Sequence, residues 1–174
     1  MIIGITGKKQ HGKDTIGKVL EEMGYTHVSF ADPLRECVRV VFGVSYEEML
    51  TTGVKETPLD RYPYESPRRI LQRVGTDLFR SAYPDVWIEA FKRTCSGGNV
   101  YATDVRFLNE AKTIKDMGGM VVRIIRPAKG DDGDLHSSEM EMEQIQADYT
   151  LVNAEGEEGI SLARETLKQI VSSI

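Results

Sequence analysis

The hydrophobic positions of this chain follow two alternating spacings. Short apolar runs, which predict buried strands, are separated by segments in which apolar residues recur every three or four positions, as on one helix face. Residues 2–6 are the first such run, and the segment 13–23 is the first helical one. Strands alternating with helices predict an α/β fold, with a mostly parallel sheet covered on both faces. Further strands are predicted at 27–31, 100–103, 120–125 and 149–152, and further helices at 32–42, 46–50, 66–80, 85–94, 109–117, 139–146 and 157–171.

Length and composition fit one globular domain. With 174 residues, 40% of them hydrophobic, the chain can bury a core without disulfides. A net charge of -5 gives no broad positive field, so we expect no polymeric nucleic acid as partner, and an anionic ligand needs local clusters of Arg and Lys. Cys37 and Cys95 have no CxxC spacing, which suits a reducing compartment and disfavours a zinc site. Without a long apolar stretch or a signal-peptide pattern, we expect a cytoplasmic protein with no membrane partner.

A glycine-rich loop follows the first predicted strand. Residues 7–13 have the spacing G-x-x-x-x-G-K between a strand and a helix, which is the context of a phosphate-binding P-loop. The glycines allow successive backbone N–H groups to point at one oxyanion, and Lys13 would reach the β and γ phosphates. The alternative is a glycine-rich turn with a surface lysine. The sequence thus predicts a three-layer sandwich of the P-loop NTPase type, with an ATP site formed by Gly7, Gln10, His11, Gly12, Lys13, Asp14 and Thr15.

The residue after the P-loop lysine differs from the usual motif. Asp14 stands where Ser or Thr normally contacts magnesium, and Thr15 follows it. Either Asp14 binds Mg²⁺, directly or through water, or Thr15 supplies a hydroxyl; oxygen ligands and bridged phosphates suit Mg²⁺ in both cases. Lys8 either helps to neutralise a transferring phosphoryl group or is an exposed loop lysine. His11 is interpreted as loop structure, because an ionised phosphate nucleophile needs little general-base help.

A second polar cluster follows the strand predicted at 100–103. Asp104 has the position of a Walker-B-like acidic residue, and Arg106, Asn109 and Glu110 come next. These side chains would gather beside the P-loop, with carboxylates for magnesium or a sugar hydroxyl and an arginine for phosphate. The alternative is an N-cap with a solvated first helical turn. Asp104 therefore joins Asp14 and Thr15 as a candidate metal ligand.

Arginines surround the helix predicted at 66–80. Arg68, Arg69, Arg73 and Arg80 flank its apolar face, which suggests a site for a second anionic ligand. The polar stretch 45–66 before it is interpreted as a substrate-side flap. We therefore expect a single kinase domain, 1–174, with an inserted helical region on the substrate side at about 33–96.

These segments together resemble the bacteriophage-type deoxynucleoside monophosphate kinases. The most specific part of the likeness is the combination of a GKDT P-loop ending with ADPL, LQxxGTD and DVRFxNE further along the chain. It spans nearly the whole sequence. The residues that carry it are 7–15, 30–34, 67–69, 71–72, 75–77, 84–87, 103–107, 109–110, 136–139, Asp148 and Asn153.

The resemblance implies transfer of the γ-phosphoryl group of ATP, with Mg²⁺, to a deoxynucleoside 5′-monophosphate. It gives catalytic roles to Lys13, Arg69 and Arg106, and adenine contacts to the backbone near Asn153. Trp87 either contacts the base or packs in the core. It also makes a homodimer plausible, and a host-cytoplasm location if the protein is phage-encoded. The implied substrate-binding residues are Lys8, Asp32, Pro33, Arg69, Gln72, Arg73, Gly75, Thr76, Trp87, Asp104, Arg106 and Glu110.

Two other functions share parts of this pattern. Another small-molecule kinase, acting on dephospho-coenzyme A or phosphomevalonate, would share the loop and the architecture. A non-kinase ATP-binding regulator would share the loop but does not account for the arginines at 68–80. Arg123 and Arg126, before the loop predicted at 127–138, have the position of lid arginines in related kinases, although this loop is short and acidic.

Overall fold

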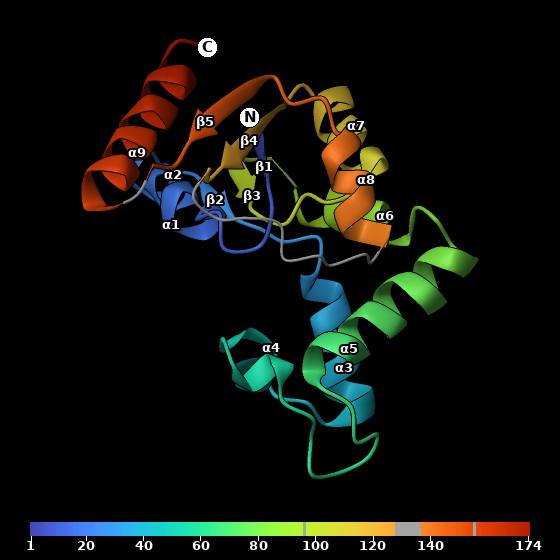
Figure 1. Cartoon of the computed structure of the whole chain (residues 1–174). Coiled ribbons are helices and arrows are strands. Elements are labelled where there is room, and N and C mark those ends of the chain that lie inside the picture. The colour runs from blue at the N-terminus through green and yellow to red at the C-terminus, as the bar shows by residue number, and fades with distance from the viewer. Residues whose placement is uncertain (96, 128–136, 155) are drawn as a thin grey trace. The chain divides into compact units, whose positions relative to one another are not determined.

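The computed structural model describes residues 1–95, 97–127, 137–154 and 156–174 (Figure 1). The chain forms two compact units. Unit 1 comprises Met1–Ser29 and Thr94–Ile174, and unit 2 comprises Phe30–Arg93. Each unit is described by itself below.

A parallel sheet forms the centre of unit 1. Its strands are β1 (Ile2–Thr6), β2 (Thr26–His27), β3 (Val100–Ala102), β4 (Met120–Ile125) and β5 (Tyr149–Val152), in the order β2-β3-β1-β4-β5. All neighbouring pairs are parallel. Every residue of β1 is buried, as expected for the central strand of a sheet covered on both faces. Parallel strands bring their carboxyl ends to one edge, where ligands of such sheets bind.

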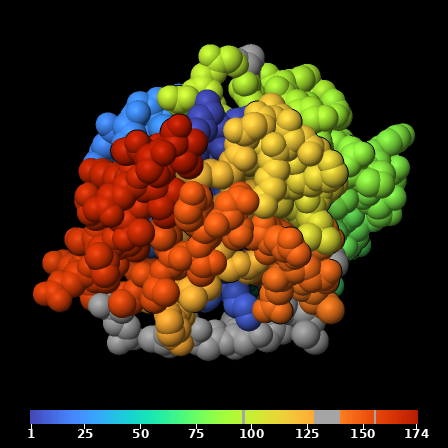
Figure 2. All heavy atoms as spheres, turned by 90° about the horizontal axis from the view of Figure 1, so that it is seen from above, coloured from blue at the N-terminus to red at the C-terminus, as the bar shows by residue number. Residues whose placement is uncertain are grey.

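Helices cover both faces of this sheet. On one face α1 (Lys13–Gly17), α2 (Val19–Glu22) and α9 (Gly156–Ser172) bury a core that includes Ile5, Leu20 and Leu167. On the other face α7 (Leu108–Asp116) approaches so closely that a Cβ at Gly4 would lie 2.5 Å from the Ile114 side chain. Figure 2 shows α9 in red and α7 in yellow on opposite sides of the orange β5. The helix α8 (Ser137–Gln144) packs beside α7.

Two predicted elements of unit 1 differ from the structure. The strand predicted at 27–31 ends at His27, although the Val28 N–H still bonds the Tyr101 carbonyl of β3; beyond it the Ser29 hydroxyl donates to Asp104. The helix predicted at 13–23 is interrupted at Lys18. The backbone N–H of Glu21 bonds the Lys18 carbonyl three residues back, so the chain tightens there into a 3₁₀-type turn.

Unit 2 is helical. It contains α3 (Asp32–Phe42), α4 (Tyr46–Leu50), a 3₁₀ turn η1 (Val54–Glu56), α5 (Pro67–Gln72), a π-helical stretch η2 (Arg73–Arg80) and α6 (Val86–Thr94). Its core gathers apolar side chains from most of these helices. The buried members of that core are Leu34, Val38, Val44, Met49, Ile70, Val74 and Trp87.

The helix α3 begins at Asp32, as predicted, and Ala31 is its N-cap. The Arg35 N–H bonds the Ala31 carbonyl, and the Asp32 carboxylate pairs with the Arg35 guanidinium. The middle of the 66–80 helix differs from the sequence prediction. The predicted single α-helix continues from Arg73 as a π-helix. In this stretch Gly75 packs against Leu34, and its carbonyl accepts a hydrogen bond from the Trp87 indole.

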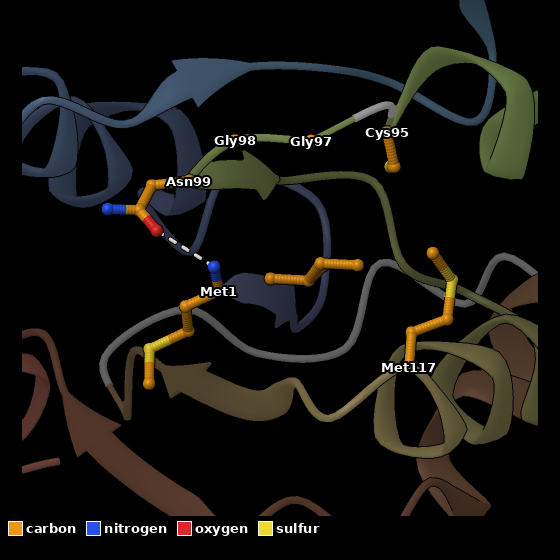
Figure 3. Close-up of a pocket in the computed structure, with 7 residues that line it drawn as sticks. Met1, Cys95, Gly97, Gly98, Asn99 and Met117 are labelled. Atoms are coloured by element: carbon orange, nitrogen blue, oxygen red, sulfur yellow. Dashed lines mark hydrogen bonds between the residues drawn. The ribbon is translucent and has the colours of Figure 1, made fainter.

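A shallow pocket of about 570 Å³ lies at the amino-terminal end of β1 and β3 (Figure 3). Met1, Cys95, Asn99 and Met117 are among its lining residues, and the Met1 amine donates to the Asn99 side chain at 2.8 Å. It therefore lies at the opposite end of β1 from the P-loop. Among the residues that the structure describes, no helix is long and apolar enough to cross a membrane.

Candidate active site

The P-loop connects the carboxyl end of β1 to α1. Gly7 (φ 140°) and Gly12 (φ 88°) adopt backbone conformations that disfavour a side chain, and Gln10 is left-handed with φ 64°. Gly12 is also the N-cap of α1, so no side chain competes for the first amides of the helix. The loop thus has the glycine-dependent geometry that lets backbone N–H groups turn toward one anion.

The Lys13 ammonium group folds back over this loop. Its Nζ donates to the carbonyl oxygens of Gly7 at 2.6 Å and Lys8 at 2.8 Å. Lysine presents three donors on a flexible stem, so the same ammonium can turn to phosphate oxygens without moving the backbone. The positive charge of Lys13 therefore lies at the loop that the sequence assigns to the phosphates.

Two contacts, made by His11 within the loop and by Asn153 after β5, hold the loop against the ends of β4 and β5. The His11 Nδ1 donates to the carbonyl of Ile124 at the end of β4, at 3.3 Å, and burial lowers the pKa of this imidazole below its usual 6.5. The Asn153 side-chain amide, 2% exposed, donates to the His11 carbonyl at 2.9 Å. His11 is thus part of the loop's support, in line with its interpretation as loop structure.

Two carboxylates meet the carboxyl end of β3. Asp14 Oδ1 accepts from the Thr103 hydroxyl at 2.5 Å, and Asp104 Oδ2 accepts from the Ser29 hydroxyl at 2.5 Å. Because Thr103 and Asp104 are adjacent, the first turn of α1 and the end of β3 bring both acidic residues to one region. Thr15, the third candidate metal ligand, is exposed on the same turn as Asp14.

This donor set fits magnesium better than a transition metal. The described residues contain no group of three or more His, Cys, Asp or Glu side chains suited to a metal. Mg²⁺ is commonly held by one or two carboxylates while substrate phosphates and water complete its octahedron. Asp14 and Asp104 offer such carboxylate oxygens.

Sequence reasoning missed Ser29 and Thr103. Both are buried hydroxyl residues that orient a candidate metal carboxylate, and Thr103 also lies 3.4 Å from His27 Nε2. Thr103 stands directly before Asp104 at a strand end, so its position was a usable signal. Ser29 gave none, because it lay inside a predicted strand.

Glu110 has a different environment from the one expected for substrate binding. Its carboxylate is 2% exposed and accepts from the backbone N–H groups of Arg106 at 2.9 Å and Phe107 at 3.1 Å. This is a capping arrangement, but a buried one, whereas the alternative left open by the sequence was a solvated first helical turn. Glu110 thereby fixes the backbone that carries Arg106, whose side chain is half-buried.

The end of α8 contacts both the P-loop and β4. Lys8 pairs with Glu143 at 2.7 Å, and Arg123 donates to the carbonyls of Ile145 at 2.6 Å and Met142 at 3.1 Å. Arg123 therefore caps the carboxyl end of α8. The predicted loop 127–138 lies mostly outside the described residues, as does His136.

The candidate acceptor residues of unit 2 lie at the start of α3 and along α5 and η2. Arg69 is exposed on α5, and the exposed Arg73 pairs with Glu65. Trp87 is 7% exposed and packs in the core of unit 2, in accordance with the packing alternative for this residue. The remaining candidates of this unit are Asp32 and Pro33 in the first turn of α3, Gln72 at the end of α5, and Gly75 and Thr76 in η2.

Comparison with known proteins gives one curated relative and many similar structures. No family model matches the chain. A protein of Acanthamoeba polyphaga mimivirus, provisionally named deoxynucleotide monophosphate kinase, is 36% identical over 171 residues, with 88% of each chain covered. Shikimate kinase from Aquifex aeolicus matches with a TM-score of 0.56 at 16% identity, over 99% of this chain and 98% of that one. Dephospho-CoA kinase from Campylobacter jejuni matches with a TM-score of 0.55 at 11% identity, over 99% and 97%. The solved structures show that the fold is that of the α/β P-loop kinases.

Proposed function

Because the chain belongs to the deoxynucleotide monophosphate kinase family, we propose that it transfers the γ-phosphoryl group of ATP to a deoxynucleoside 5′-monophosphate, giving the diphosphate and ADP. The observation that carries this proposal is the P-loop itself, with Lys13 folded over the loop carbonyls at 2.6 and 2.8 Å. Its neighbours support the same chemistry, since carboxylates at Asp14 and Asp104 adjoin a loop built for an anion.

The P-loop residues bind the triphosphate of ATP in this proposal. Lys13 exchanges its loop carbonyls for the β and γ phosphates, and the backbone amides after Gly12 face the same oxygens. Lys8 adds a further positive charge at the start of the loop once its exposed ion pair with Glu143 opens. The remaining ATP contacts come from Gly7, Gln10, His11, Asp14, Thr15 and the backbone at Asn153.

Asp14 and Asp104 would hold Mg²⁺, directly or through water, with the Thr15 hydroxyl as a further oxygen ligand. The chemistry that Mg²⁺ would supply at these carboxylates is positive charge, which would offset the negative charge that develops during transfer. Thr103 and Ser29 keep the two carboxylates oriented, because the Thr103 hydroxyl donates to Asp14 and the Ser29 hydroxyl donates to Asp104.

The acceptor monophosphate binds through arginines. Arg69 and Arg73 approach its phosphate, and Arg69 and Arg106 stabilise the transferring group, because planar guanidinium groups can contact phosphate oxygens bidentately. A phosphate nucleophile is already ionised, so positioning and charge stabilisation supply most of the catalysis. Two buried residues, Trp87 and Glu110, support their neighbours in this site. The acceptor site is completed by Lys8, Asp32, Pro33, Gln72, Gly75, Thr76 and Asp104.

We infer that the two units act as one kinase domain spanning 1–174. Unit 1 supplies the ATP site, and the helical unit 2 is the substrate-side region expected at about 33–96. Unit 2 has its own apolar core, which allows it to carry acceptor contacts on a separately packed scaffold.

An acceptor profile tests this proposal. ADP formation is followed in a coupled assay with ATP, Mg²⁺ and each deoxy- or ribonucleoside monophosphate in turn, with dephospho-coenzyme A as the acceptor of the rival small-molecule kinase. We expect turnover with at least one deoxynucleoside monophosphate and none with dephospho-coenzyme A. Activity on dephospho-coenzyme A alone, or ADP formation that no acceptor stimulates, would refute the assignment.

A further inference from the structure

The P-loop is held by contacts to the carboxyl ends of two neighbouring strands, β4 and β5. The Asn153 N–H bonds the carbonyl of Ile125, the last residue of β4, at 2.8 Å, which continues the pairing with β4 one residue past the end of β5. This bond fixes the main chain of Asn153 beside the loop. Its side chain then donates to the His11 carbonyl at 2.9 Å, in the middle of the loop.

The contact between Asn153 and the loop is close. A Cβ built on Gly12 would lie 2.5 Å from the Asn153 side-chain nitrogen, so the amide packs directly against the last loop residue before Lys13. His11 is anchored separately, by its ring, to the Ile124 carbonyl. The backbone of residues 11–12 is therefore clamped between a carbonyl of β4 and an amide at the end of β5.

Stability alone does not account for an asparagine at this position. Asn153 is 2% exposed, and its side-chain oxygen is buried without a partner among the described residues. Burying an unpaired polar atom costs free energy that an apolar side chain of similar size would avoid. Among the described residues, its side-chain amide bonds the P-loop alone, which suggests that the benefit lies there.

From this geometry we infer that Asn153 is a positioning residue, which holds the P-loop in its phosphate-binding conformation before nucleotide arrives. The inference rests on the proposed function. A preformed loop does not pay the cost of ordering its backbone when the phosphates bind. Asn153 therefore raises the affinity for the phosphate chain itself, whatever base is attached to it.

This role differs from an adenine contact in what it predicts. A side chain that contacted adenine would favour adenine nucleotides over other nucleotides and would have no effect on a base-free polyphosphate. A residue that shapes the loop affects ADP, GDP and inorganic tripolyphosphate by the same factor.

Calorimetric titration of wild-type protein and Asn153→Ala with ADP, GDP and tripolyphosphate, without Mg²⁺, tests the inference. We expect the dissociation constants of all three ligands to rise together, by about tenfold, for one lost buried hydrogen bond. Val171→Ala is the matched control, because it trims a buried α9 side chain of the unit 1 core and should lower the melting temperature with unchanged affinities. If Asn153→Ala does not fold, Asn153→Leu keeps a similar side-chain volume while removing the donor and adding no charge.

Three outcomes would overturn the inference. Unchanged affinities in the Asn153 variant would show that the loop keeps its shape without this bond. A loss confined to ADP would make Asn153 an adenine contact, and a similar loss in Val171→Ala would make the effect one of general stability. Wild-type protein that binds none of the three ligands would instead refute the proposed function, and this inference with it.

Discussion

The P-loop of unit 1 and the arginine-bearing helices of unit 2 hold their cations in different ways. Lys13 is held by main-chain carbonyls of a loop that is itself clamped by buried contacts through His11 and Asn153. Arg73 instead pairs with a side-chain carboxylate, Glu65, on an exposed surface. Exposed ion pairs contribute little to stability and exchange readily with other anions. The difference indicates that the proposed donor site is rigid and the proposed acceptor site is adaptable.

Replacement of Lys13 should have the largest effect on this comparison. We expect Lys13→Ala to reduce kcat by roughly 10²- to 10³-fold, as for loss of one preorganised charge-stabilising group. The half-buried Lys13 side chain bonds two carbonyls of its own loop, so circular dichroism should show a folded protein. Wild-type turnover in this variant would remove the P-loop from the chemistry.

Arg69→Ala should have the next largest effect, confined to the acceptor side. A charged hydrogen bond to phosphate contributes about 1.5–3 kcal/mol, so kcat/KM for the monophosphate should fall by roughly 10- to 100-fold. The dissociation constant of ADP should not change. Arg69→Lys should recover only part of the loss, because lysine cannot bind bidentately. A weakened affinity for ADP would show instead that Arg69 serves the donor site.

A smaller effect is expected from Thr103→Val, which removes the hydroxyl that bonds Asp14 but keeps the shape of the side chain. The hydrogen bond that orients Asp14 contributes about 1 kcal/mol to Mg²⁺ binding. Its loss should raise the Mg²⁺ concentration for half-maximal activity by about fivefold. Thr103→Ser is the matched control and should behave as wild type. Equal Mg²⁺ requirements in all three proteins would show that Asp14 is not a metal ligand.

The smallest effect is expected from Glu65→Gln, because the Arg73 pair is exposed. A contribution below about 1 kcal/mol limits the change in KM for the acceptor to less than about fivefold. Glu47→Gln, on the exposed side of α4, controls for the loss of one charge in unit 2. A tenfold or larger change would mean that the acceptor site is as rigidly built as the P-loop.

The fold class and the five strands followed from local sequence pattern, and the α/β P-loop fold is confirmed by the structure and its neighbours. The strand at 2–6 and the loop after it were predictable because a fully apolar run and a G-x-x-x-x-G-K spacing are both local signals. No such signal marks Ser29, whose hydroxyl donates to Asp104, 75 residues away.

Parts of the candidate site depended on tertiary contacts that the sequence does not encode locally. Glu110 lies three residues after Phe107, a spacing that suits a cap as well as a ligand. Asn153 was associated with ATP through family resemblance, but its contact with His11 joins positions 142 apart. Arg123 stands in a lid-like position in the sequence, yet its guanidinium caps α8. Residue type and spacing suggested these sites, and packing determines what each side chain contacts.

Transfer of label from γ-phosphate-labelled ATP is the most direct test of the central claim, because ADP formation alone cannot distinguish transfer from hydrolysis. The wild-type protein is incubated with labelled ATP, Mg²⁺ and an equimolar mixture of the four common deoxynucleoside monophosphates, and the products are separated. The account predicts label in a deoxynucleoside diphosphate, formed roughly 10²- to 10³-fold more slowly with Lys13→Ala. Label released only as inorganic phosphate, or retained entirely in ATP, would contradict it.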